Sequence, residues 1–290
     1  MAQYLFYKVA GHTFRLSFPA TTKYEYSLSN YAPFRISDGE KNTIFHLSIT
    51  EVLSGKEYKQ VGQFDDDIAS IGVYKSVEGN FRFRIAYPGS NDCCTMDADA
   101  SFAVAQAVLP ANEQLRGFCL NNCLMLLYAF ATSSLDTVLM HASVIKHNNK
   151  GFMFLGKSGT GKSTHSRLWL EHIAGSELLN DDNPVIRVIN GQAYVFGTPW
   201  SGKTPCYKND NAPLKGIVKL SQAPENKIKK LSTLHGYAAV LPACSGMRWE
   251  EAIASGIHRT VEKLASSVAC YHLGCLPNEA AAKLSSDTMQ

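Results

Sequence analysis

Hydrophobic and polar residues alternate through much of the first hundred residues. Segments 13–18 and 45–49 each place Phe, Leu or Ile at every second position. The segment IGVYKSVEGNFRFRIAY at 71–87 continues the pattern around Gly79 and Asn80, where we expect the turn of a hairpin. Because successive side chains of a strand point to opposite faces of a sheet, the pattern predicts a β-rich N-terminal domain.

The hydrophobic period changes after Pro110. The segment NEQLRGFCLNNCLMLLYAFA at 112–131 is long, rich in Leu and Ala and free of Pro, which predicts a mostly buried helix. We place the domain boundary before this helix. The predicted domains are residues 1–110, whose role the sequence leaves open, and residues 111–290.

Short apolar runs then alternate with helical segments, and this order predicts an α/β domain. The hairpin expected at 184–197 has the dipeptide Asn190-Gly191 at its turn, which suits a tight primed turn. The expected strands are 137–145, 152–155, 214–220 and 268–273, and the expected helices are 162–174, 248–267 and 277–286.

The charge and hydropathy of the chain favour a cytoplasmic protein that binds neither nucleic acid nor a membrane. The 28 Lys and Arg nearly balance the 25 Asp and Glu, and the segment NKIKK at 226–230 is interpreted as a solvated turn. The first residues lack the pattern of a signal peptide. The longest apolar stretch, 118–131, is interrupted by Asn121 and Asn122 and is too short to span a bilayer.

The eight cysteines are scattered, and none forms a CxxC pair with a matching second pair. We therefore expect reduced thiols rather than disulfides or a zinc site.

A glycine-rich motif at 156–163, GKSGTGKS, fits the phosphate-loop pattern of a glycine, four residues and Gly-Lys-Ser. Glycines let consecutive backbone N–H groups turn toward an anion, and the helix that follows directs its positive end to the same place. Lys162 can bridge phosphate oxygens, and the Ser163 hydroxyl can ligate Mg²⁺. The motif follows an apolar strand and begins a helix, so it predicts binding of ATP or another nucleoside triphosphate with Mg²⁺.

Two adjacent carboxylates follow in LLNDDN at 178–183, namely Asp181 and Asp182. An Asp pair before a proline is also typical of a turn or a helix cap. Here the chain returns after the predicted helix, so a strand can bring the pair to the phosphate end. One carboxylate then ligates the metal and the other accepts the proton of an attacking hydroxyl. The sequence does not say which residue has which role.

The segment FGTPWSGKT at 196–204 is the other candidate for the site. Its Gly, Pro and Ser content predicts a loop. Lys203 could stabilise charge on a transferred phosphoryl group and Trp200 could form a substrate wall, or the loop could be purely structural. Arg167, on the predicted helix, could face either substrate or solvent.

Three motifs together resemble the catalytic domain of HPr kinase/phosphorylase, whose fold is shared with ATP-dependent phosphoenolpyruvate carboxykinase. They are the histidine of HASVI, the loop GKSGTGKST and the pair in NDDN, and His141 lies 15 residues before Gly156. The similarity spans about 137–220, including APLKGIVKL, whereas residues 1–110 match neither family. It implies a P-loop kinase domain of this type, a mixed sheet with helices, after the β-rich domain.

The resemblance also implies roles for individual residues. Asp181 and Asp182 serve as metal ligand and general base, Ser163 as a further metal ligand, and His141 lies beside the transferred group. The predicted catalytic residues are Asp181, Asp182, His141, Lys162 and Lys203. The predicted nucleotide-binding residues are Gly156, Lys157, Ser158, Gly159, Thr160, Gly161, Lys162, Ser163 and Thr164.

Three functions fit these motifs: a kinase acting on a protein serine or a small-molecule hydroxyl, a carboxykinase, and a nucleotide-sensing regulatory protein. Carboxykinases use a lysine upstream of the histidine and several substrate-binding arginines. This chain has no Lys between Lys75 and Lys146, and Arg116 is the only Arg between Arg84 and Arg167. The intact loop and Asp pair favour the kinase over a regulator. The second, downstream signature of HPr kinases is not evident, so the acceptor stays open, as does a homo-oligomer like the rings of related kinases.

Overall fold

The computed structural model describes all residues except 1, 20–24, 38–41, 66–68, 91 and 203. The chain forms two compact units, Met1–Ala131 and Thr132–Gln290. The division therefore falls after the helix at 113–131, and not before it at residue 110 as the change of hydrophobic period suggested. The reason is packing, because this helix buries its apolar residues against the N-terminal sheet.

The first unit contains a mixed sheet with the strand order β3-β1-β2-β4-β9-β8-β7-β6-β5. The β2–β4 and β4–β9 pairs are parallel and the other pairs are antiparallel. A 3-10 helix, η1 (Glu25–Phe34), precedes β3. The strands are β1 (Ala2–Val9), β2 (His12–Pro19), β3 (Arg35–Ile36), β4 (Thr43–Ile49), β5 (Lys59–Asp65), β6 (Ser70–Lys75), β7 (Phe81–Ala86), β8 (Cys93–Ala98) and β9 (Val104–Val108).

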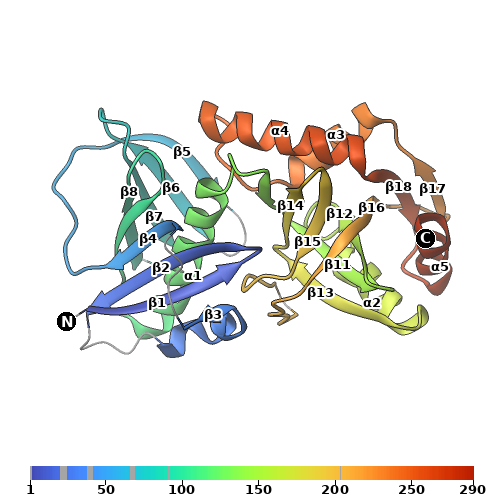
Figure 1. Ribbon diagram of the computed structural model, residues 1–290, viewed down its shortest axis with the longest axis horizontal. Coiled ribbons are helices and arrows are strands. Elements are labelled where there is room, and N and C mark those ends of the chain that lie inside the picture. Colours follow the sequence, from blue (N-terminus) through green and yellow to red (C-terminus); the bar gives the residue numbers. More distant parts are fainter. Residues whose placement is uncertain (1, 20–24, 38–41, 66–68, 91, 203) are drawn as a thin grey trace. The chain divides into compact units, whose positions relative to one another are not determined.

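The helix α1 (Glu113–Ala131) packs on this sheet and forms the core of the first unit with it (Figure 1). Phe14 and Phe45 stack with their ring centroids 4.7 Å apart, and the Tyr128 hydroxyl donates a hydrogen bond to the carbonyl of Val9. The predicted β-rich character and the predicted helix are confirmed. The β6–β7 hairpin turns at Gly79, whose φ of +87° favours glycine.

The second unit contains a second mixed sheet, so the predicted α/β character is confirmed. Its strand order is β10-β14-β15-β16-β12-β11-β13, with β18 pairing both β16 and β17. The strands are β10 (Thr137–Leu139), β11 (Ala142–His147), β12 (Lys150–Leu155), β13 (Ser176–Asp182), β14 (Val185–Ile189), β15 (Gln192–Phe196), β16 (Asn211–Gln222), β17 (Lys227–Lys230) and β18 (Ala269–Cys275). The helices are α2 (Lys162–His172), α3 (Thr233–Val240), the 3-10 turn η2 (Leu241–Ala243), α4 (Glu251–Ser267) and α5 (Glu279–Met289).

Two segments of the second unit differ from the sequence prediction. The apolar run 137–145 forms two strands because the chain breaks at His141, whose backbone N–H donates to the carbonyl of Ala243. The segment NKIKK is not a solvated turn but the strand β17, paired with β18. Ile228 packs against the core while the lysines beside it stay exposed, as is usual for an edge strand.

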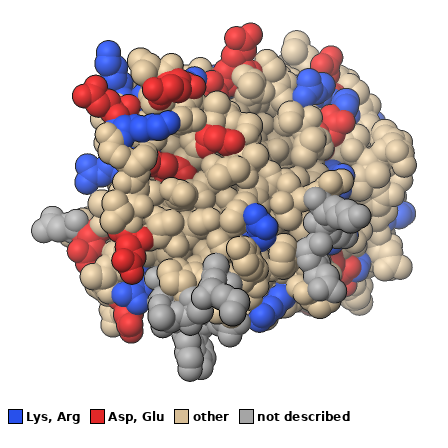
Figure 2. All heavy atoms as spheres, turned by 60° about the vertical axis from the view of Figure 1, so that its left-hand side comes forward, with Lys and Arg blue, Asp and Glu red and all other residues tan. Residues whose placement is uncertain are grey.

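Among the described residues, none of the helices combines the length and the hydropathy that crossing a bilayer requires. All eight cysteines are free thiols, as predicted, and most of them are buried. On the face seen in Figure 2, acidic and basic side chains are interspersed among broad uncharged areas.

The buried hydroxyl of Ser285 joins α5 to α2, the helix that follows the glycine-rich loop. The Ser285 hydroxyl lies 2.9 Å from both Trp169 Nε1 and His165 Nε2, and it donates its own proton to the carbonyl of Ala282. The hydroxyl therefore accepts from both rings, so His165 carries a proton on Nε2.

We expect His165 to make the protein less stable at acidic pH. Burial lowers the pKa of His165 from 6.5 to about 4. The unfolded chain then binds the proton more readily, so the free energy of unfolding falls as the pH drops from 6.5 toward 4, by up to about 3 kcal/mol. Urea denaturation at pH 7 and pH 5 should show a larger loss for the wild type than for His165→Gln. Equal losses in the two proteins would contradict this role.

Candidate active site

The glycine-rich loop joins the buried strand β12 to the first turn of α2. Gly159 and Gly161 have φ values of +76° and +108°, a region that glycine adopts without strain. A Cβ at Gly156 would lie 3.0 Å from the Cβ of Thr160, a contact so close that Thr160 would have to shift. The strand, loop and helix therefore follow one another as a phosphate loop requires.

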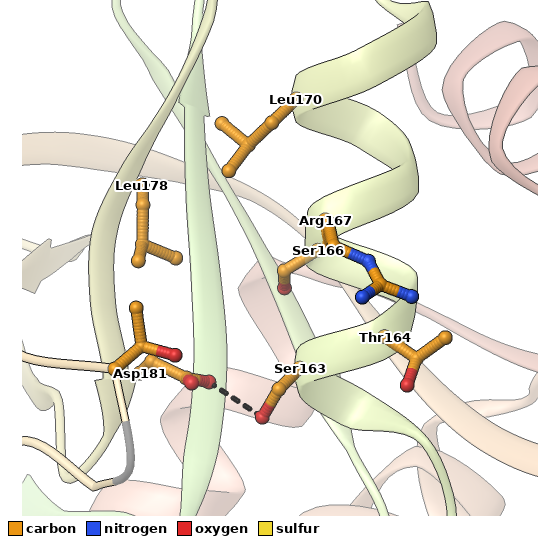
Figure 3. Close-up of a pocket in the computed structure, with 8 residues that line it drawn as sticks. Ser163, Thr164, Ser166, Arg167, Leu170, Leu178 and Asp181 are labelled. Atoms are coloured by element: carbon orange, nitrogen blue, oxygen red, sulfur yellow. Dashed lines mark hydrogen bonds between the residues drawn. The ribbon is translucent and has the colours of Figure 1, made fainter.

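The strand β13 brings Asp181 to the beginning of α2. It pairs antiparallel with β11, with Asp181 opposite Ser143. The Ser163 hydroxyl, in the first turn of α2, donates a hydrogen bond of 3.0 Å to Asp181 Oδ1 (Figure 3). Asp181 is buried, so this carboxylate is held in place beside the loop. The predicted return of the chain at ELLNDD is confirmed.

Asp182 belongs to a second set of polar contacts, which continues through His141 to Lys162. His141 Nδ1 lies 2.9 Å from Asp182 Oδ1, and Lys162 Nζ lies 2.9 Å from His141 Nε2 and 3.0 Å from the carbonyl oxygen of Gly156. Since the ammonium can only donate, Nε2 accepts and the imidazole proton lies on Nδ1, directed at Asp182. Burial lowers the pKa of Lys162, and the nearby carboxylates of Asp182 and Asp181 oppose that shift.

The backbone at Asp182 is strained, with a φ of +125°. Such strain costs of order 1–3 kcal/mol and persists only where surrounding contacts fix it. Here Asn183 Nδ2 donates a 2.8 Å hydrogen bond to Asp182 Oδ2, and Asp182 forms a β-bridge with Ser201. The conformation of this carboxylate is thus determined by neighbours outside β13.

A buried hydrogen-bond network around residues 180–183, the segment that contains Asp181 and Asp182, was not predicted from the sequence. Asn180 is fully buried, and its amide donates to Thr198 Oγ1 at 3.0 Å and to the carbonyl of Trp200 at 3.2 Å. Its Oδ1 accepts from the backbone N–H of Asn183 at 3.0 Å, and the Thr198 hydroxyl donates to the Asn183 carbonyl at 2.7 Å. The available signal was the pair of Asn residues that flanks the Asp pair in NDDN.

The loop at 196–204 also contacts this segment directly, since the backbone N–H of Gly202 donates to the carbonyl of Asp181 at 2.7 Å. Trp200 has 1% of its surface exposed, so it packs in the interior and does not form a substrate wall. Lys203 lies outside the described residues. The side chain of Arg167 is 67% exposed and forms an ion pair with Glu171 at 3.6 Å.

The donor set fits Mg²⁺ delivered with a nucleotide better than a site built by protein alone. In the described part of the chain, no group of three or more His, Cys, Asp or Glu side chains is arranged to hold a metal. Mg²⁺ usually takes one or two oxygen ligands from the protein and the rest from phosphate and water. The paired oxygens of Ser163 and Asp181, next to the glycine-rich loop, match that requirement.

Comparisons with known proteins give a structural similarity at low sequence identity. Neither the protein-family models nor the curated proteins include a match. Among solved structures, the chain is similar to the HPr(Ser) kinase/phosphatase from Coxiella burnetii, at 12% identity and a TM-score of 0.32, over 52% of this chain and 95% of that one. A similarity at this level does not indicate a function for this chain.

Proposed function

We propose that this protein is an ATP- and Mg²⁺-dependent phosphotransferase that moves the γ-phosphoryl group to a hydroxyl. One observation carries the proposal. The two adjacent carboxylates reach the phosphate loop in different ways, Asp181 through Ser163 and Asp182 through His141 and Lys162. A site that only binds nucleotide has no need of a second carboxylate paired with histidine.

The loop and its lysine bind the phosphates in this proposal. The backbone N–H groups between Gly156 and Lys162 surround the phosphate oxygens, and Lys162 exchanges His141 for those oxygens when nucleotide is bound. Ser163 and Asp181 would hold Mg²⁺. When bound, Mg²⁺ neutralises part of the negative charge on the phosphates.

Asp182 is the proposed general base. The acceptor oxygen forms a bond to the γ-phosphorus, while the bond from that phosphorus to the bridging oxygen breaks and its electron pair leaves with ADP. The hydroxyl proton passes to the Asp182 carboxylate. His141 orients this carboxylate through the 2.9 Å contact from Nδ1 to Oδ1.

The proposal is tested with the full chain, γ-labelled ATP, Mg²⁺ and a mixture of candidate protein and small-molecule acceptors. We expect label in a specific phosphate ester. Release of label only as free phosphate would contradict the proposal and favour a regulatory role. A parallel reaction with oxaloacetate tests the carboxykinase, which predicts ATP-dependent formation of phosphoenolpyruvate.

The network around Thr198 should affect both transfer and stability. Thr198→Val leaves the buried amide of Asn180 and the carbonyl of Asn183 with one partner fewer, so we expect the free energy of unfolding to fall by about 1–3 kcal/mol. Looser positioning of Asp182 should lower kcat by about ten- to a hundredfold, with little change in KM for ATP. Thr198→Ser keeps the hydroxyl and should retain most of both. If the Ser and Val variants lose kcat equally, the hydroxyl has no positioning role.

A further inference from the structure

A pocket lies between α2 and β13, beside the hydrogen bond that joins Ser163 to Asp181 (Figure 3). Its volume is about 250 Å³, the space of roughly eight water molecules at about 30 Å³ each. This is below the roughly 300–1,000 Å³ of pockets for drug-sized ligands. The pocket therefore suits a small molecule rather than a whole nucleotide.

The lining of the pocket changes from polar to apolar along α2. Ser163 and Asp181 lie at the end next to the phosphate loop, and Leu170 and Leu178 face each other at the far end (Figure 3). A ligand that fills the pocket would place a polar group beside the carboxylate and carbon atoms against the leucines. The remaining lining residues are Thr164, Ser166, Arg167 and Thr204.

Arg167 gives the pocket its charge preference. It lies one helical turn beyond Ser163, and in Figure 3 its guanidinium extends toward the Thr164 end of the pocket. Its ion pair with Glu171 is a contact of 3.6 Å between exposed side chains, which is weak. A guanidinium has five N–H donors in a fork that matches a carboxylate or phosphate group.

We infer that this pocket binds the phosphoryl acceptor, a small hydroxyl compound that carries a carboxylate or phosphate group. The inference rests on the proposed kinase function and names its substrate class. The anionic group pairs with Arg167 and the carbon atoms pack toward the leucines. The hydroxyl lies at the Ser163–Asp181 end and, because Asp182 does not line the pocket, it has to extend beyond Asp181 to reach the proposed general base. A serine side chain of a protein, which is only a Cβ and an Oγ, would leave most of this volume unfilled.

The test compares acceptors that differ in charge. Glycerate and glycerol 3-phosphate are assayed against neutral glycerol with γ-labelled ATP and Mg²⁺. We expect the anionic acceptors to be used, and Arg167→Gln to raise their KM by about ten- to a hundredfold without changing KM for ATP. Arg167→Lys should recover only part of the loss, because it cannot form the bidentate contact. Arg259→Ala, which removes an exposed arginine of α4, is the matched control and should behave as wild type.

Several results would overturn the inference. These are equal use of glycerol, a raised KM for ATP in Arg167→Gln, and label transferred only to protein hydroxyls. Calorimetric titration of both anions, in the presence of Mg²⁺ and a non-hydrolysable ATP analogue, separates this inference from the proposed function. Absence of transfer to any acceptor refutes the kinase, whereas absence of Arg167-dependent anion binding refutes the pocket assignment.

Discussion

Replacing Asp182 with Asn is expected to slow phosphoryl transfer by about a thousandfold, within the range for loss of a general base. The amide oxygen of Asn can still accept the proton that His141 Nδ1 directs at this position, and Asn183 can turn its own amide oxygen toward the new NH2 group, so the site should keep its geometry. What is lost is the group that takes the proton of the acceptor hydroxyl. Single-turnover rates of label transfer, together with equilibrium titration of the nucleotide, measure the two effects separately.

The matched variant is Asp181→Asn. Because Asp181 is bonded to Ser163 and not to His141, its loss should raise the Mg²⁺ concentration needed for half-maximal rate. In Asp182→Asn that concentration should change little. If both variants respond to Mg²⁺ in the same way, or if Asp182→Asn loses nucleotide binding, the division of roles between the two carboxylates is wrong.

Replacing Lys162 with Ala is expected to weaken nucleotide binding by about a hundredfold, since it removes charge-assisted hydrogen bonds to phosphate oxygens. Lys162 is buried in the site and lies 3.0 Å from the Gly156 carbonyl, so its ammonium is already close to where phosphates would bind. Displacement of a fluorescent ATP analogue measures the affinity. Transfer should be lost as well, because Lys162 also bridges the phosphates in the proposed mechanism.

Lys150→Ala is the control for general charge effects, since Lys150 is exposed at the beginning of β12, at the other end of this strand from the glycine-rich loop. Thermal unfolding checks that both variants are folded. Equal nucleotide affinity in wild type and Lys162→Ala would show that the glycine-rich loop is not a phosphate site. Equal weakening by both lysine substitutions would mean that charge alone, and not the position of Lys162, drives binding.

Features that depend on a few neighbouring residues could be predicted from the sequence. The hairpin turn at Asn190 and Gly191 has φ values of +50° and +80°, which few residue types adopt, so the dipeptide identified it. The glycine-rich loop between a strand and a helix was likewise predicted, because Gly159 and Gly161 satisfy a local backbone requirement there. Both rest on conformational preferences that are independent of distant parts of the chain.

Burial and partnership could not be predicted in this way. Trp200 packs in the interior, although its loop composition suggested an accessible position. The helix at 113–131 belongs to the first unit because of the sheet it packs on, which its own hydrophobic period does not specify. The Asn180 amide donates a hydrogen bond to the hydroxyl of Thr198, 18 residues away, and no local sequence pattern links these two residues.

The sequence by itself determined that a glycine-rich loop with the phosphate-loop pattern is followed by two carboxylates. Only the tertiary structure decided that Asp181 meets Ser163 while Asp182 meets His141. The physical reason is twofold. The register of β13 against β11 places Asp181 opposite Ser143, and the backbone at Asp182, with a φ of +125° and contacts to Asn183 and Ser201, departs from regular strand geometry. Two neighbouring residues with the same chemistry thereby acquire different surroundings.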